Sequence, residues 1–335
     1  MRSKRCSRAR RARREHAEHH SQAGDPLRWQ RAYHTEGQTR RTVDSPPCVA
    51  ERRGMDRACK GRFLPRRLPR PVPGNTCTMT TDTTLAAALA EAWRGGRPLT
   101  ADTATRLAPA DEAGAYAVQR EIAATLGWFA EGRPHAWKMG ASTRTAEPTA
   151  SPIADRALRT APVELGPRDR HTLVGVEVEL AVRLARPLAP GCSAAEARAA
   201  VGEVLAAIEI CDVRAEAWPT LPPLFRLADQ QMNGWLILGS GVADGWSDGY
   251  AAGEVVMTVN GAEQLRARAA HPLGDPLYLL PWLAGHAAGQ YAGGLQAGDI
   301  VTTGTWTGLY AARPGDRIHA AFEGIGEVAL SISAE

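Results

Sequence analysis

The sequence predicts an α+β fold for the part of the chain after about residue 80, and three observations support that class. The stretch over about 82–130 reads as helical, because its apolar residues recur at three- and four-residue spacing. From about residue 171 the pattern changes to short segments in which apolar and polar residues alternate. These segments lack the regular helical crossovers that a doubly wound parallel sheet requires.

The helices can be placed from apolar spacing and capping signals. Leu85, Leu89 and Trp93 share one helix face, and Asp111 with the residue after it begins a second helix that runs to about residue 126. Ser193 followed by Glu196 is a capping box, which predicts a helix over 196–208. A further helix is expected over 276–293.

The strands follow from alternation. Period-two patterns predict strands over 173–182, 253–261, 297–304, 316–322 and 326–332. Another short strand, over 206–211, should follow the capped helix.

The charge of the chain is divided unevenly along its 335 residues. Residues 1–78 hold 20 basic and 7 acidic residues, a net charge of +13, whereas residues 79–335 hold 20 basic and 29 acidic residues, a net charge of −9. Residues 1–78 also lack the apolar periodicity needed for a core. We expect a disordered basic extension, most simply explained by a mis-called start upstream of Met79; nucleic-acid binding, a transit peptide and a twin-arginine signal are weaker interpretations.

Several classes of protein are excluded for residues 79–335. The segment has no run of 18 apolar residues and neither of the glycine-rich nucleotide motifs, so we expect no membrane span, no nucleic acid and no nucleotide cofactor. Its two cysteines, Cys192 and Cys211, form no metal-binding pair and fit a reduced, cytoplasmic compartment.

Three glutamates suggest a site for a hard cation. Glu177 and Glu179 alternate with apolar residues on one strand and therefore share a face, although an ordinary solvent-facing strand would show the same pattern. Glu209 lies in an otherwise apolar strand, where a carboxylate needs an arginine partner or a metal. Carboxylate oxygens suit Mg²⁺ or Mn²⁺.

Lys138 is the single lysine among residues 79–335, beside 19 arginines. An ammonium group can give up a proton where a guanidinium group practically cannot, so this lysine is a candidate proton carrier. Its apolar neighbours predict a lowered pKa for Lys138. Chance retention of a lysine on a strand edge is the simpler alternative.

The order of short motifs resembles the 2-keto-4-pentenoate hydratase family, within the fumarylacetoacetate hydrolase superfamily. These motifs are AYAVQ (115–119), WKMG (137–140), GVEVE (175–179), AIEICDVR (207–214), LADQQMNG (227–234), HPL (271–273) and AGDIVTTGTWTG (297–308). The resemblance covers essentially all of 79–335. It implies a rolled mixed β-sheet of the fumarylacetoacetase C-terminal type, with an N-terminal helical subdomain over 79–165 that carries the lysine and a catalytic domain over 166–335.

The same resemblance assigns roles to individual residues. Glu177, Glu179 and Glu209 match metal ligands for Mg²⁺ or Mn²⁺, and Lys138 matches the active-site lysine. Residues near the substrate are implied at the turn Thr303, Gly304 and Thr305, with Asp229 and Asn233 as further pocket candidates. Relatives of this kind are homo-oligomers.

Two departures from the pattern concern the residues around the lysine. The aspartate expected to assist Lys138 is displaced, with Asp155 as its candidate after Pro152 and Ile153, a pair more similar to decarboxylases of the family. His135 is the nearest histidine for a hydrolytic reaction. Gln230 and Gln231 stand where an Asp-Asn pair is common.

The expected activity is hydration of a 2-hydroxy-2,4-dienoate to a 4-hydroxy-2-oxo acid, in the catabolism of aromatic compounds. Two alternatives use the same enolate chemistry: decarboxylation of 2-oxo-3-hexenedioate, and C–C hydrolysis of an acylpyruvate. A binding or scaffold protein on the same fold is the non-enzymatic alternative.

Overall fold

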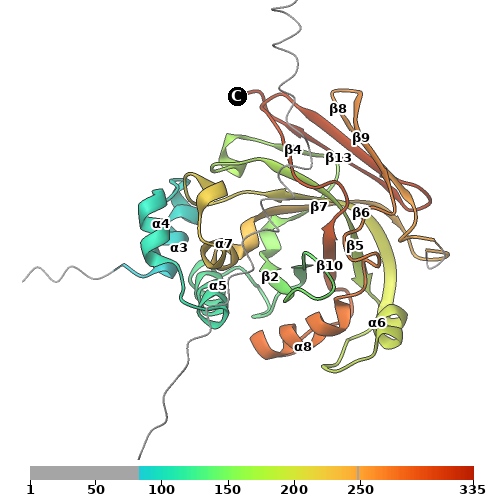
Figure 1. Cartoon of the computed structure of the whole chain (residues 1–335), viewed down its shortest axis with the longest axis horizontal. Coiled ribbons are helices and arrows are strands. Elements are labelled where there is room, and N and C mark those ends of the chain that lie inside the picture. The colour runs from blue at the N-terminus through green and yellow to red at the C-terminus, as the bar shows by residue number, and fades with distance from the viewer. Residues whose placement is uncertain (1–82, 247–248) are drawn as a thin grey trace, which may run out of the picture. The chain divides into compact units, whose positions relative to one another are not determined.

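A computed structural model of the chain describes residues 83–246 and 249–335 (Figure 1). The expectations for residues 1–78 lie outside these ranges. Residues 83–335 belong to one unit of the structure.

The described chain begins with three helices, as the apolar spacing predicted. They are α3 (Leu85–Gly95), α4 (Ala101–Leu107) and α5 (Glu112–Leu126). Each is capped by an oxygen-bearing side chain that accepts a hydrogen bond from the first turn; for α5 this is the predicted Asp111, which accepts from Gly114 N–H. The glycines Gly96 and Gly127 end α3 and α5 in the left-handed conformation.

The larger sheet has eight strands in the order β2-β1-β10-β5-β6-β7-β3, with β11 paired to β5. Its strands are β1 (Ala136–Gly140), β2 (Thr149–Ile153), β3 (Leu158–Thr160), β5 (Gly175–Leu184), β6 (Val201–Cys211), β7 (Asn233–Val242), β10 (Ile300–Thr305) and β11 (Tyr310–Ala311). The sheet is mixed, because β1 runs parallel to β10 and β3 parallel to β7. β1, β2 and β3, which all precede residue 166, are thus part of the same sheet as strands that follow it.

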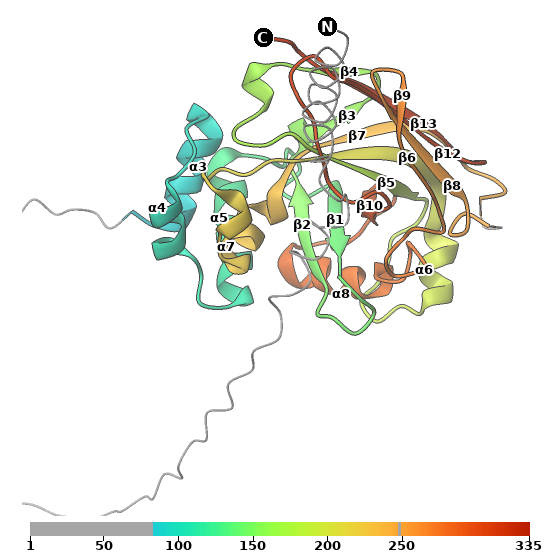
Figure 2. The ribbon, with the colours of Figure 1, turned by 45° about the horizontal axis from the view of Figure 1, so that its top comes forward.

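A second sheet has five strands in the order β4-β13-β12-β8-β9. Its strands are β4 (Val163–Leu165), β8 (Glu254–Val259), β9 (Ala262–Arg268), β12 (Arg317–Phe322) and β13 (Gly326–Ile332). Figures 1 and 2 show this sheet on the side of the larger sheet away from α3, α4 and α5. The alternation of the sequence therefore identified β5, β8, β10, β12 and β13, and the expected α+β class with a rolled mixed sheet is confirmed.

The predicted helix over 196–208 is wrong beyond its first turns. The capping box of Ser193 and Glu196 does begin a helix, α6 (Ala194–Ala200), but β6 starts at Val201. β6 pairs with β5 on one side and β7 on the other, and nearly all its residues are buried. A strand buried on both faces has a continuous apolar sequence, which periodicity alone cannot distinguish from a helix.

The larger sheet separates two apolar clusters. One lies between the two sheets and under α8 (Leu280–Gln290), and contains Val176 and Val178 of β5. The other lies beneath α3, α5 and α7 (Pro223–Ala228), and contains Ala181, Ala207 and Ala136. Side chains alternate between the two faces along a strand. The face covered by α3, α5 and α7 therefore carries the candidate site residues Glu177, Glu179, Glu209 and Lys138.

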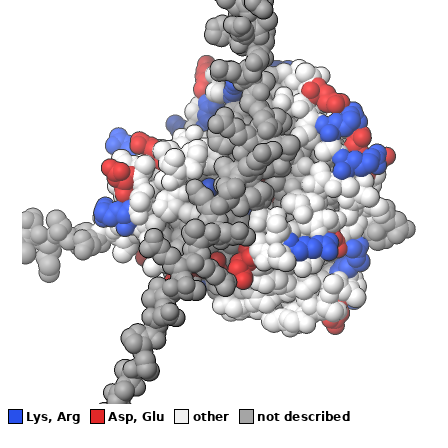
Figure 3. Space-filling model, viewed as in Figure 1, with Lys and Arg blue, Asp and Glu red and all other residues white. Residues whose placement is uncertain are grey.

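The described surface carries charges of both signs. On the face shown in Figure 3, basic and acidic side chains lie interspersed rather than gathered by sign. Exposed ion pairs join Arg266 to Glu254 and Glu263, and Arg268 to Glu323. Among the described residues, none of the helices is both long and apolar enough to cross a membrane.

Candidate metal and lysine centre

The pairing of β5 with β6 brings the candidate metal ligands together. Glu177 lies directly opposite Glu209 in the antiparallel register, and Glu179 lies opposite Ala207. Cys211 follows Glu209 by two residues and therefore shares its face. One ligand atom from each of Glu177, Glu209 and Cys211 can be chosen so that all three atoms lie within 4.8 Å of one another.

Glu179 is held in place by β10. It is 2% exposed, and its Oε2 accepts hydrogen bonds from Gly304 N–H at 2.9 Å and from the Thr302 hydroxyl. Burial, together with the charges of Glu209 and Glu177, raises the pKa of Glu179 to about 8. The compact group of three ligand atoms thus contains Cys211, while Glu179 lies beside it, anchored to the neighbouring strand.

Lys138 reaches this group from β1. Its Nζ lies 2.5 Å from Glu209 Oε1 and donates a second hydrogen bond to the main-chain oxygen of Gln231 at 3.0 Å. Asn233 Nδ2 also donates to Glu209 Oε1, at 3.0 Å. The other carboxylate oxygen, Glu209 Oε2, is buried and has no hydrogen-bond partner among the described residues.

The expected lowering of the lysine pKa is wrong for this arrangement. Burial is the largest single influence and lowers the pKa of Lys138, as the apolar neighbours suggested. The charges of Glu209, Cys211 and Glu177 and the hydrogen bond to Glu209 together outweigh it, so the pKa is raised. The sequence shows the apolar neighbours but not a carboxylate that lies 71 positions away.

The residues fit a hard divalent cation. Burial and the charge of Glu209 raise the pKa of Glu177, so the carboxylates disfavour each other's ionised forms. Glu209 Oε2 is buried and accepts no hydrogen bond, so a positive ion beside it would stabilise the carboxylate. Mg²⁺ and Mn²⁺ meet both conditions through oxygen ligands.

The pKa of Cys211 is raised by burial and by the nearby carboxylates, and its thiol donates to Glu177 Oε2 at 3.2 Å.

The turn at the end of β10 lies against this centre through its main chain. Thr303 uses its hydroxyl to donate to the oxygen of Leu180, and its own carbonyl oxygen contacts His271 Nε2 at 2.9 Å. Leu273 N–H donates to His271 Nδ1, so the ring is neutral with its proton on Nε2, and burial lowers the pKa of His271. Gly304 has φ +108, and a β-carbon there would lie 3.4 Å from His271 Nε2. Thr305 contacts the carbonyl of Gly308.

Asp155 and His135 lie away from Lys138. Ser151 is the residue opposite Lys138 in the β1–β2 register, and Asp155 follows four residues later. The Oδ2 of Asp155 accepts from Ala130 N–H, and its Oδ1 lies 3.7 Å from His135 Nδ1. The other ring nitrogen of His135 lies 3.1 Å from Glu131.

Asp229 is enclosed in the core instead of facing the lysine. It is 0% exposed and forms an ion pair with Arg214, also 0% exposed, at 2.6 Å. The guanidinium of Arg214 lies 4.0 Å from the ring centre of Trp93 and also donates to the carbonyl oxygens of Asp229 and Asn233. The structure therefore gathers Lys138, the three glutamates and Asn233, and places Asp229 in a supporting ion pair.

Three neighbours of the centre were not identified as site residues from the sequence. Cys211 could have been found, because its two-residue spacing from Glu209 places it on the same face. His271 lies within the HPL motif, but nothing in that motif shows its contact with Thr303. Gln231 contacts Lys138 through a turn that contains no glycine and gives no signal in the sequence.

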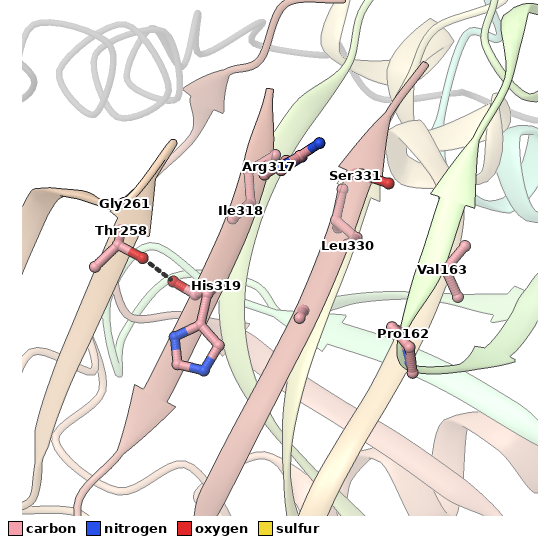
Figure 4. A pocket seen from close by; sticks show the side chains of 10 residues that line it. Pro162, Val163, Thr258, Gly261, Arg317, Ile318, His319, Leu330 and Ser331 are labelled. Carbon is pink, nitrogen blue, oxygen red and sulfur yellow. Dashed lines mark hydrogen bonds between the residues drawn. The ribbon is translucent and has the colours of Figure 1, made fainter. Parts of the chain in front are cut away.

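A pocket on the five-stranded sheet is separate from this centre. It is lined by residues including Thr258, Arg317, His319 and Ser331 (Figure 4). These side chains come from β8, β12 and β13, and none belongs to the lysine and glutamate group. The pocket therefore contributes nothing to the chemistry of the candidate centre.

Comparisons with known proteins identify the family of the chain. Residues 139–333 match the model of the family described as fumarylacetoacetate (FAA) hydrolase C-terminal. The chain is 32% identical over 251 residues to 2-keto-4-pentenoate hydratase 2 of Dechloromonas aromatica (strain RCB), covering 72% of this chain and 94% of that protein. It is 30% identical over 228 residues to 2-oxo-hept-4-ene-1,7-dioate hydratase of Escherichia coli, covering 64% of this chain and 84% of that protein.

A solved structure shows the same fold. The 4-oxalocrotonate decarboxylase from Pseudomonas putida G7, complexed with magnesium and adipate, superimposes with a TM-score of 0.65 at 26% identity, covering 74% of this chain and 95% of that chain. The chain belongs to the fumarylacetoacetate hydrolase family and is an enzyme of that family, as the order of its motifs suggested.

Proposed function

We propose that this protein is a divalent-metal-dependent hydratase that adds water to a 2-hydroxy-2,4-dienoate of the 2-keto-4-pentenoate type. The product would be a 4-hydroxy-2-oxo acid. The observation that carries the proposal is the position of Lys138, whose Nζ is held 2.5 Å from Glu209, a fully buried carboxylate that lies opposite Glu177. The names of the relatives that match most of the chain support hydration over other reactions of the family.

Glu177, Glu179 and Glu209 would hold Mg²⁺ or Mn²⁺. When bound, such an ion supplies Lewis acidity that stabilises the enolate of a 2-oxo acid. Cys211 lies close enough to contribute, but a thiol is a soft ligand and matches these hard ions poorly. In this proposal the thiol instead holds Glu177 through its hydrogen bond.

The protein's own groups would orient and protonate the substrate. Lys138 would deliver the proton that converts the dienol to the ketone, since its ammonium lies at the edge of the carboxylate group. Asn233 fixes the orientation of Glu209 through its side-chain amide. Gly304 N–H holds Glu179 against β10, on the same face of the sheet as the other two glutamates.

A decarboxylase is the second candidate, favoured by the structural similarity to 4-oxalocrotonate decarboxylase. Both reactions pass through the same enolate, and they differ in whether water is added or CO₂ is lost.

A comparison of substrates by the full chain with Mg²⁺ would test the proposal. We expect 2-hydroxypenta-2,4-dienoate to lose its dienol absorbance and give a hydrated product, whereas release of CO₂ from 2-oxo-3-hexenedioate would favour the decarboxylase. Cleavage of an acylpyruvate would favour a hydrolase. A chain that turns over none of these three substrates, and that shows no heat of Mg²⁺ or Mn²⁺ binding in calorimetry, would favour a scaffold protein.

Lys138→Arg provides a sharp control for the role of the lysine. The substitution keeps a positive charge next to Glu209, but a guanidinium does not release a proton under these conditions. We expect turnover to be lost and metal binding to persist.

The homo-oligomer implied by the family resemblance stays a prediction, which light scattering of the purified chain would test.

A further inference from the structure

The turn after α7 has an unusual backbone. Gln230, Gln231 and Met232 are three successive residues with positive φ, at 53°, 53° and 65°. A left-handed conformation costs a residue with a side chain about 1–2 kcal/mol. Strain of this kind persists where surrounding contacts fix it, and it is common at functional sites.

The contacts of the turn converge on the lysine. The carbonyl oxygen of Gln231 accepts from Lys138 Nζ at 3.0 Å, and that of Met232 accepts from Asp212 N–H at 2.8 Å. The side chain of Gln231 extends to β2, where its Nε2 donates to Thr149 Oγ1 at 2.8 Å. One residue thus contacts Lys138 through its main chain and β2 through its side chain.

The side-chain amide of Gln231 lies on the same face of the sheet as Lys138. Gly140 is opposite Thr149 in the β1–β2 register and shares the face of Lys138, two residues or about 7 Å away along the strand. A β-carbon on Gly140 would lie 3.7 Å from Gln231 Nε2. The amide therefore lines the face beyond the lysine, in the direction away from Ala136.

The oxygen atom of the Gln231 amide makes no hydrogen bond within the described residues. This atom, Oε1, is buried. Leaving a buried acceptor unsatisfied costs about 1–3 kcal/mol, so a donor is expected at this position in the working protein. An amide oxygen is neutral and accepts hydrogen bonds; it would bind a water or hydroxyl and would repel a substrate carboxylate.

We infer that Gln231 Oε1 accepts a hydrogen bond from the water that is added to the substrate. This inference rests on the proposed hydratase function. In that reaction one proton moves from the 2-hydroxyl group to the terminal carbon, which gives a 2-oxo-3-alkenoate. The oxygen of water then bonds to C4, and the electron pair of the C3–C4 double bond moves to C3.

The proton balance of this step requires no further reactant. The attacking water loses one proton to solvent, and C3 takes up one proton from solvent, so that the net change is the addition of one water molecule. Gln231 takes no proton itself. It is a water-positioning residue, and it sets how often the 2-oxo-3-alkenoate is hydrated before it leaves.

Gln231→Met would test this role, because methionine has a similar length and lacks both polar atoms of the amide. Proton NMR of the products would measure the ratio of 4-hydroxy-2-oxo acid to 2-oxo-3-alkenoate formed from 2-hydroxypenta-2,4-dienoate. We expect the ratio to fall about tenfold, the effect of losing about 1.4 kcal/mol at one step. Gln264→Met, the same change on exposed β9, should leave the ratio unaltered.

A second variant keeps the test valid if Gln231→Met folds poorly. Asparagine tolerates positive φ better than most residues, so Gln231→Asn should preserve the turn while withdrawing the amide oxygen by one methylene group. It should also lower the product ratio. An unchanged ratio in both variants, whatever happens to dienol consumption, would overturn the inference alone. A wild-type chain that yields no hydrated product would overturn the proposed function as well.

Discussion

Glu209→Gln is the substitution that examines the candidate centre most directly, because it removes one charge and preserves the shape of the side chain. In the structure Glu209 is 0% exposed, and its Oε1 accepts from both Lys138 and Asn233. Removing one partner of a buried ion pair generally costs about 3–5 kcal/mol. Here the loss also relieves repulsion with Glu177 and Glu179, whose pKa values Glu209 raises. We therefore expect a net destabilisation at the low end or below, about 1–3 kcal/mol without metal.

The response to metal should be larger and more specific. An ion present at 100 times its dissociation constant stabilises a protein by about 2.7 kcal/mol. For a chain of this size that corresponds to an increase in Tm of about 4–5 °C. The glutamine variant loses a charged ligand, so at the same Mg²⁺ or Mn²⁺ concentration it should show little of this increase and no metal-dependent turnover.

Thermal unfolding with EDTA, Mg²⁺ or Mn²⁺ would measure both effects. Glu203→Gln is a suitable control, because Glu203 lies on the same strand but forms a half-exposed pair with Arg183. If Glu209→Gln shows the same metal-induced increase in Tm as the wild type and keeps full turnover, the assignment of Glu209 as a ligand is refuted.

Three further outcomes are expected. Arg214→Met should lower Tm by about 6–9 °C, because it leaves Asp229 buried without its partner. Arg183→Met removes a half-exposed pair and should lower Tm by under about 2 °C; equal losses in the two variants would contradict the burial argument. Burial holds the pKa of His286 at about 4, below its unfolded value near 6.5, so stability should be fully present above pH 6.5 and decline by about 1–2 kcal/mol toward pH 4, after allowance for partial exposure. Urea titrations of His286→Gln should show a weaker decline across that range, and an unchanged pH profile would exclude His286 as its source. Cys211→Ser should keep its Mg²⁺ affinity, measured by calorimetry, within about twofold of the wild type; a much larger loss would show that the thiol is a ligand.

Local signals predicted much of the fold correctly. Asp111 and the Ser193–Glu196 box fix helix starts through hydrogen bonds within three residues, so the sequence contains all the necessary information. The alternation around Glu177 likewise determines that this residue and Glu179 share a face. The segment from Val201 to Ile208 was misassigned because its partners, β5 and β7, decide its conformation from both sides.

The centre itself depends on contacts between distant parts of the chain. Glu177 and Glu209 could be proposed as ligands from their apolar neighbours, but only the β5–β6 register shows that they face each other. The contact of Lys138 with Gln231 arises from three left-handed residues that include no glycine, and no propensity rule predicts such a turn.

The parallel pairing of β1 with β10 has a consequence for how the protein is made. Ala136, the first residue of β1, is paired with Ile300, which lies 300 − 136 = 164 positions later in the chain. During translation β1 therefore lacks this neighbour until β10 has been synthesised, and Glu179 acquires its Gly304 contact only after the same delay. Such long-range pairing makes folding slow and leaves strand edges open meanwhile. The centre should therefore be complete only after β10 has paired with β1 and β5, and a metal ion would bind to it only from that point on.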